Sequence, residues 1–300
     1  MTMTPPRTYT TLTTRGLRHD SLPMRLYHKA KKLGIWDPRE IDLTQDRQDW
    51  ANIPEQFKER LFRLILGFQA GEEAVTLDLL PLIMTMAREG RLEEEMFLTT
   101  FLWEEAKHTE FFRRVLDEVI QEQGDLHLFR SEDRTPGDGN NRDLFGEELP
   151  RAMNLLLSDP SPVNQVRASV MYNMIIEGVL AETGYQSFFK MLSMTNAMPG
   201  LQQGLLLIKR DESRHIAYGV YLISRLVAAD KSLWPVVENR MNELFARVAA
   251  DQERNGTPEF LRDYARQQFQ KRLNRIRRAL DQSPEQLDQA ADIEEEVVES

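Results

Sequence analysis

Two of the five histidines in this 300-residue chain follow a glutamate by three positions. The pairs are Glu105–His108 and Glu212–His215. Because an α-helix makes one turn every 3.6 residues, side chains three apart point about 60° from each other and can reach one ligand. A carboxylate and an imidazole in this arrangement can bind a transition metal.

Both pairs lie on an apolar helix face. Apolar side chains surround them at helical spacing: Phe97, Phe101, Phe112 and Val115 around the first pair, and Leu205, Ile208 and Leu222 around the second. Taken singly, such a pair is also typical of a surface ion pair or a buried core histidine. A carboxylate buried without a partner costs several kcal/mol, so two inward-facing pairs predict cations between them.

Each pair also has a second inward-facing glutamate one helix upstream. Glu72 precedes the first pair, whereas its neighbour Glu73 falls on a more polar line, and Glu177 precedes the second pair within an apolar run. Four glutamates and two histidines in this repeated arrangement are the ligand set of ferritin-like carboxylate-bridged dinuclear sites. Four carboxylates neutralise two divalent ions, and one imidazole per ion favours iron or manganese over calcium.

The elements that must position these residues are helices, because strand patterns are nearly absent and apolar residues recur every three or four positions. We predict an all-α fold, a ferritin-like helical bundle with a four-helix metal-binding core plus additional helices. An irregular stretch runs through Trp36 and Trp50, and the polar residues 125–150 are interpreted as a surface connection. The predicted helices span 21–34, 54–80 with a break at Pro81, a continuation to 90, 91–123, 161–195, 199–230, 231–251 and 257–281.

Composition limits the remaining possibilities. The chain has no cysteine, which excludes disulfides and thiolate metal sites, and its formal net charge of −10 argues against nucleic acid as a partner. No signal peptide or long apolar run is present, so we expect a cytoplasmic protein without stable membrane insertion. The predicted organisation is an N-terminal extension (1–20), a single ferritin-like di-metal domain (21–281) and an acidic, disordered tail (282–300).

Over about residues 20–250 the chain resembles the R2-like ligand-binding oxidases, relatives of the ribonucleotide reductase small subunit. The resemblance is carried by GEEAVTLD (71–78), GRLEEEMFLTTF (90–101), EEAKH (104–108), VRASVMYNMIIEGVLAETGY (166–185) and DESRH (211–215). It implies an O2-activating oxidase of lipid metabolism with one manganese and one iron per chain, a di-iron form being the alternative. It also implies a bound long-chain fatty acid and a homodimer.

Carried over by this resemblance, the ligand set divides into two metal sites. The manganese site would be Glu72, Glu105 and His108; the iron site would be Glu177, Glu212 and His215, with Glu105 bridging.

The resemblance further implies an ether cross-link between Val75 and Tyr172. Helical periodicity places Val75 toward the metals, but an ideal α-helix would rotate Tyr172 about 140° away from Glu177. Tyr185 matches a second tyrosine near the site, and Asp211 matches an acceptor for a ligand histidine.

Two other functions fit the sequence less well than the oxidase. A radical-generating reductase small subunit usually has tyrosine four residues after the first ligand histidine, where this chain has Phe112, although manganese/iron versions also have phenylalanine there. Such a subunit docks its partner through an aromatic-bearing tail. The C-terminal ADIEEEVVES has no aromatic residue. A ferritin-like metal store needs a self-assembling cage, which this long, irregular chain does not suggest. The oxidase is therefore favoured.

Overall fold

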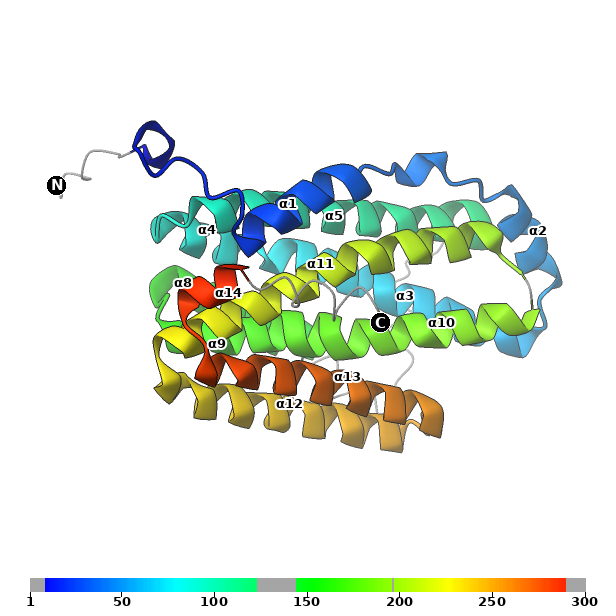
Figure 1. Ribbon diagram of the computed structural model, residues 1–300. Helices are drawn as coiled ribbons and strands as arrows, with labels where there is room; N and C mark the ends of the chain where they lie inside the picture. Colours follow the sequence, from blue (N-terminus) through cyan, green and yellow to red (C-terminus); the bar gives the residue numbers. More distant parts are fainter. Residues whose placement is uncertain (1–8, 123–143, 196, 290–300) are drawn as a thin grey trace.

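The computed structural model describes residues 9–122, 144–195 and 197–289, which form helices and no strand (Figure 1). The predicted all-α bundle is confirmed. Four long helical elements form its centre: α3 (Glu55–Asp78), α5 (Leu92–Arg114), α11 (Pro199–Ala229) and one continuous run. That run consists of α9 (Pro162–Ser169), the π-helix η5 (Val170–Ala181) and α10 (Glu182–Thr195).

Local chemistry sets the ends of the first helices as the sequence predicts. Helix α1 (Leu22–Leu33) begins after Ser21 and ends at Gly34, and α3 begins after Pro54. The predicted break at Pro81 separates α3 from α4 (Leu80–Arg88), because proline lacks the N–H that an uninterrupted helix needs.

Two of the three π-helical segments in the described chain lie in the long central helices, with hydrogen bonds that span five residues rather than four. Helix α5 continues as η3 (Val115–Ile120), which ends at Gln121 in a left-handed conformation (φ 59°). The second segment is η5, which is twelve residues long. Because a π-helix winds more widely than an α-helix, side chains five apart return toward one face.

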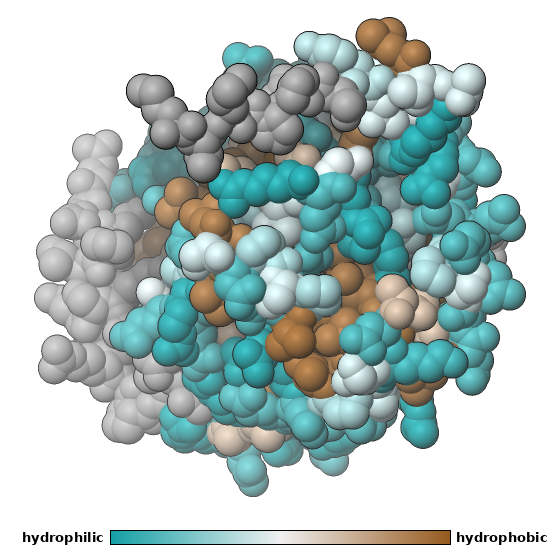
Figure 2. Space-filling view, turned by 90° about the vertical axis from the view of Figure 1, so that its left-hand side faces the viewer, coloured by the Kyte–Doolittle hydropathy of each residue, from teal (hydrophilic) through white to brown (hydrophobic). Residues whose placement is uncertain are grey.

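The remaining helices cover the central four. Helices α12 (Trp234–Arg254) and α13 (Glu259–Arg277) lie side by side along the flank formed by η5 and α10, and α1 lies across α5 and α11 (Figure 1). The short α14 (Pro284–Gln289) contacts α11 and α1. The end of the bundle in Figure 2 is mostly hydrophilic with small apolar patches.

The irregular stretch expected through Trp36 and Trp50 contains a helix, α2 (Thr44–Asn52). Its mostly polar sequence has no apolar stripe, so periodicity missed it. Asp46 on α2 is buried and accepts hydrogen bonds from the backbone N–H groups of Gly200 (2.8 Å) and Leu201 (2.6 Å). It thus caps the N-terminus of α11, a role that the local sequence does not show.

Two further differences concern segments interpreted as non-helical. The predicted connection 125–150 lies largely outside the described residues, but from 144 onward the chain forms η4 (Leu144–Glu148) and α8 (Leu149–Ser158), packed beside α4 and α9. The tail expected from residue 282 begins with α14, whose Leu287 is buried, and residues 290–300 lie outside the description. None of the described helices is long and apolar enough to span a bilayer.

Candidate metal centre

The structure brings all six predicted ligand residues together, buried between the four central helices. They form two overlapping groups, and within each group one ligand atom per residue lies within 4.8 Å of the others. The first group is Glu72, Glu105, His108 and Glu212; the second is Glu105, Glu177, Glu212 and His215.

The two histidines point the same ring atom toward the carboxylates. His108 Nδ1 lies 3.5 Å from Glu72 Oε2, 3.6 Å from Glu105 Oε2 and 3.4 Å from Glu212 Oε1. His215 Nδ1 lies 3.0 Å from Glu105 Oε1 and 3.9 Å from Glu212 Oε2. Glu105 and Glu212 are therefore both placed between the histidines, whereas the sequence analysis assigned bridging to Glu105 alone.

Glu177 completes the second group from η5, with Oε1 3.8 Å from His215 Nδ1. Its Oε2 accepts a hydrogen bond from Asn173 Nδ2 at 3.0 Å. One oxygen of Glu177 is thus held by its own helix, and the other faces the shared centre.

The donor set fits two cations. Buried ligand atoms without a hydrogen-bond partner in the described chain face the centre: both oxygens of Glu105, Glu177 Oε1, Glu212 Oε2 and Nδ1 of both histidines. Such atoms are normally satisfied in proteins, so a cluster of them indicates ligands that the protein alone does not supply. Oxygen and nitrogen donors in this number suit iron or manganese.

Electrostatics support the same interpretation. Burial, followed by the charge of Glu212, raises the pKa of Glu105 and of Glu177 well above the ordinary value. Burial raises the pKa of Glu212 to about 7. Burial would lower the pKa of His108, but the hydrogen bond with Asp211 and the nearby carboxylates of the centre raise it well above its usual range. A centre that resists holding so many negative charges is one that bound cations would stabilise.

The outer ring nitrogens of the two histidines face acids from opposite helices. His108 Nε2 lies 3.4 Å from Asp211 Oδ2, the acceptor that the sequence resemblance implied, and His215 Nε2 lies 2.9 Å from Glu104 Oε2. Sequence reasoning missed Glu104. Glu104 directly precedes Glu105 in EEAKH, and Asp211 directly precedes Glu212 in DESRH. An alignment of the two motifs would therefore have shown that Glu104 and Asp211 are equivalent.

These two acids share cations. Arg214 donates to both Glu104 and Asp211, and Lys107 Nζ lies 3.2 Å from Asp211 Oδ2. Burial opposes ionisation of Asp211, but the hydrogen bond with His108 and both cations hold its pKa well below the usual range. Trp36 also donates its indole N–H to Asp211 at 2.8 Å. Asp211 is thus an anion fixed on several sides, as suits the orientation of a ligand imidazole.

The π-helix explains how Tyr172 reaches the site. α-Helical geometry turns Tyr172 away from Glu177, five residues on, but in η5 the two side chains share a face. Tyr172 is fully buried, and its hydroxyl donates to the backbone carbonyl of Val75 at 2.9 Å. Its ring also packs edge-on against Phe101, which stacks on His215.

Tyr185 and Phe112 lie in the apolar wall on the α10 side. Both are buried and pack against Phe68, with ring centres 4.9 Å and 5.3 Å away, respectively. Tyr185 has no hydrogen-bond partner for its hydroxyl among the described residues, and burial raises its pKa well above the ordinary value.

Comparisons with known proteins agree with this geometry. The family model for the small chain of ribonucleotide reductase matches residues 24–264. A solved R2-like ligand-binding oxidase variant with an anaerobically reconstituted Mn/Fe cofactor is 39% identical, with a TM-score of 0.83, over 90% of this chain and 98% of the other. The R2-like ligand-binding oxidase from Sulfolobus acidocaldarius is 40% identical, with a TM-score of 0.84, over 94% and 98%.

Proposed function

Because the chain belongs to the R2-like ligand-binding oxidases, within the ribonucleotide reductase small-chain family, we propose that it binds one manganese and one iron and oxidises a lipid with O2. Glu72, Glu105 and His108 would hold manganese. The iron ligands would be Glu177, Glu212 and His215, with Glu105 bridging. The observation that carries this proposal is the convergence of these buried side chains with their ligand atoms unpartnered.

When bound, the two metals supply reducing electrons to O2 and then an oxidant for an unactivated C–H bond. The chain holds the carboxylates in register and orients each imidazole from outside through Glu104 and Asp211. It also surrounds the site with an apolar wall that excludes water. We propose a long-chain fatty acid as the bound ligand and a homodimer as the assembly, with a role in lipid metabolism.

Metal loading tests the ligand assignment. Glu72→Ala or His215→Ala is expected to reduce the metal content below two ions per chain, because each removes a donor from the centre. Glu73→Ala is the matched control, since Glu73 neighbours Glu72 on α3 but is exposed. Elemental analysis after loading with both metals measures the stoichiometry. Two metals per chain in the Glu72 and His215 variants would refute the assignment.

We also propose the ether cross-link between Val75 Cβ and Tyr172 Oη. Its formation removes one hydrogen from each residue, and the two electrons and two protons go to the reduction of O2. The hydrogen bond from the Tyr172 hydroxyl to the Val75 carbonyl supports the pairing, because it holds the phenol beside that residue.

Peptide mass mapping tests the cross-link. After aerobic loading we expect the two peptides to be joined and two hydrogens lighter than their sum. Tyr172→Phe, which lacks the phenol oxygen, should leave them separate. Separate, unmodified peptides in the aerobically loaded native chain would contradict this part of the proposal.

A further inference from the structure

A row of aromatic rings leads away from the metal centre toward the end of the bundle where α14 packs. Phe101 stacks on His215 with ring centres 3.6 Å apart, and Phe97 follows at 6.1 Å. Tyr218 lies 5.1 Å from Phe97, and Tyr221 lies 6.4 Å from Tyr218. Successive rings in near contact are suited to moving single electrons between a buried centre and the surface.

Tyr218 has what a redox-active tyrosine needs, an acceptor for its proton. It is fully buried, and its hydroxyl donates to Glu94 Oε2 at 3.0 Å. Arg91 and Arg225 lie 3.3 Å from the other oxygen of Glu94. Glu94 is thus fixed by two cations beside the Tyr218 hydroxyl, at hydrogen-bond distance for taking up the phenolic proton and giving it back.

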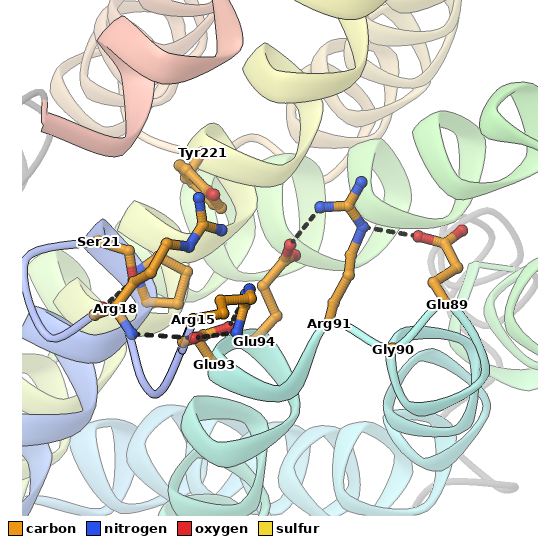
Figure 3. A pocket seen from close by; sticks show the side chains of 10 residues that line it. Arg15, Arg18, Ser21, Glu89, Gly90, Arg91, Glu93, Glu94 and Tyr221 are labelled. Carbon is orange, nitrogen blue, oxygen red and sulfur yellow. Dashed lines mark hydrogen bonds and ion pairs between the residues drawn. The ribbon is translucent and has the colours of Figure 1, made fainter. Parts of the chain in front are cut away.

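The outer end of the row reaches a cavity. Tyr221 lines a space of about 230 Å³ together with charged residues that include Arg18 and Arg91 (Figure 3). Its hydroxyl donates to Asp288 of α14. Tyr221 therefore also has a proton acceptor, and although only 2% of it is exposed, it lines a cavity that a small water-soluble reductant can enter.

Other aromatic residues near the centre are less suited to the same role. The Tyr185 hydroxyl has no acceptor in the described chain, so loss of an electron would leave a proton with nowhere to go. Trp36 reaches the centre through Asp211, but Lys107 Nζ lies 4.4 Å from its ring centre. A positive charge on the indole face opposes removal of an electron.

We propose that Tyr218 is a one-electron relay between the metal centre and Tyr221, an inference that rests on the proposed oxidase function. Tyr218 gives one electron to the oxidised centre and its phenolic proton to Glu94, which leaves a neutral phenoxyl radical. Tyr221 then gives one electron to that radical and its own proton to Asp288, while Glu94 returns the first proton. An external one-electron reductant restores Tyr221, with its proton returned by Asp288.

The number of electrons needed to reduce O2 defines when the relay is needed. Reduction of O2 to water takes four electrons; oxidation of the two metals by one step each gives two, and the cross-link gives the other two. A turnover that forms no cross-link takes these two electrons from the C–H bond of the lipid or, when no lipid is bound, from the relay, one at a time. Lipid-free Tyr172→Phe protein creates the second situation, so the radical should form there.

The test uses lipid-free Tyr172→Phe protein loaded anaerobically with Mn(II) and Fe(II), mixed with O2 and freeze-quenched for electron paramagnetic resonance. We expect a radical whose spectrum narrows when the tyrosines are ring-deuterated. Adding Tyr218→Phe should abolish most of it. Adding Tyr185→Phe or Tyr264→Phe should leave it in place; Tyr264 is the matched control because it also donates to a buried glutamate, Glu182, at 2.7 Å.

Persistence of the radical without Tyr218, or no tyrosyl radical although both metals bind and are oxidised, overturns the relay. Metal content and the cross-link mass of the native chain report the proposed function separately; failure to bind two metals contradicts that function and the relay with it. Ascorbate supplies a second measurement: Tyr221→Phe in the Tyr172→Phe background should slow its quenching of the radical several-fold. An unchanged quenching rate overturns the route through Tyr221.

Discussion

At the scale of single residues, His108 and His215 use their two ring nitrogens in the same way. Each turns Nδ1 to the shared carboxylates and Nε2 to an acid from the opposite helix, Asp211 or Glu104. A ligand imidazole held in this way is fixed in both tautomer and orientation. Burial, with the charge of Asp211, raises the pKa of Glu104 to about 7, and Arg214 opposes this shift.

Replacement of these outer acids should weaken metal binding without removing a ligand. For Glu104→Ala or Asp211→Ala we expect about 10–100-fold weaker affinity, because the ligand imidazole loses the partner that orients it. Competition with a chelator measures this change. Glu110→Ala is the control, an exposed acid on the same helix. An affinity equal to that of the native chain would show that the outer contacts do not position the histidines.

Asp78 gives a prediction for pH. Burial raises its pKa from 3.8 to about 6, so the folded chain binds this proton more tightly than the unfolded chain. Stability is therefore lost as pH rises from about 4 to 6. Asp78→Asn should increase the unfolding free energy by about 1–2 kcal/mol at pH 7, after allowance for screening, and by nothing near pH 3. Thermal melts at both pH values measure this difference, and an equal gain at both would contradict it.

Individual ligand residues were more predictable than their supports. Glu105, His108, Glu212 and His215 interrupt apolar stripes, so a charged residue in an apolar pattern revealed them. Glu104 lies beside an already charged neighbour and has no such contrast. The role of Glu104 depends on which helix packs against α5, and this is determined by tertiary structure rather than by the local sequence.

At the scale of elements, η5 brings Tyr172 and Glu177 to the same face, and it depends on close helix packing. The approach of α11 is possible because Gly219 has no side chain: a Cβ there would lie 2.2 Å from Asn173 Cβ. Asn173 in turn holds Glu177. A displacement of Asn173 would therefore also move Glu177, one of the predicted metal ligands.

Gly219→Ala should cost about 1–3 kcal/mol of unfolding free energy through overpacking, and it should weaken metal binding at the Glu177 site. Gly67→Ala is the matched control, a glycine in the middle of α3 with nothing within 4 Å of the added methyl group. It should instead stabilise the chain by up to about 1 kcal/mol. Chemical denaturation measures both effects. Equal behaviour of the two variants would show that the contact with η5 is not tight.

The sequence predicted most of these elements because amphipathic helices repeat every 3.6 residues. It placed the ends of α1 and the start of α3 closely, from Ser21, Gly34 and Pro54. It could not predict η5, because its apolar residues do not distinguish four-residue from five-residue hydrogen bonding. The wrong rotation inferred for Tyr172 follows from that single difference.

At the scale of the whole molecule, α14 ties the end of the chain to its beginning and middle. Leu287 is buried in the main core, while Asp288 bonds to Arg18 near the N-terminus and to Tyr221 on α11. One helical turn thus joins segments from three parts of the sequence. The acidic composition of the tail led us to predict disorder from residue 282. Helix α14 was missed because Leu287 is a single apolar residue among polar neighbours.

Two shortened chains test this anchor. A chain that ends at Asp281 should be less stable than one that ends at Gln289 by about 1.5–3 kcal/mol, the value of burying one leucine. The comparison isolates α14, because both chains lack the last eleven residues. Differential scanning calorimetry measures the difference. Identical melting temperatures would show that α14 adds no stability.

The acids beside the two histidines are exchanged between helices, which gives the centre a two-fold form. Glu104 on α5 serves the histidine of α11, and Asp211 on α11 serves the histidine of α5. Such reciprocal contacts are the rule at a two-fold symmetric dimer interface. There, if one residue of the first subunit contacts a second residue of its partner, the same two positions also make contact with the subunits exchanged. The metal centre thus has the two-fold form of such an interface within a single chain, and neither half could orient its own histidine alone.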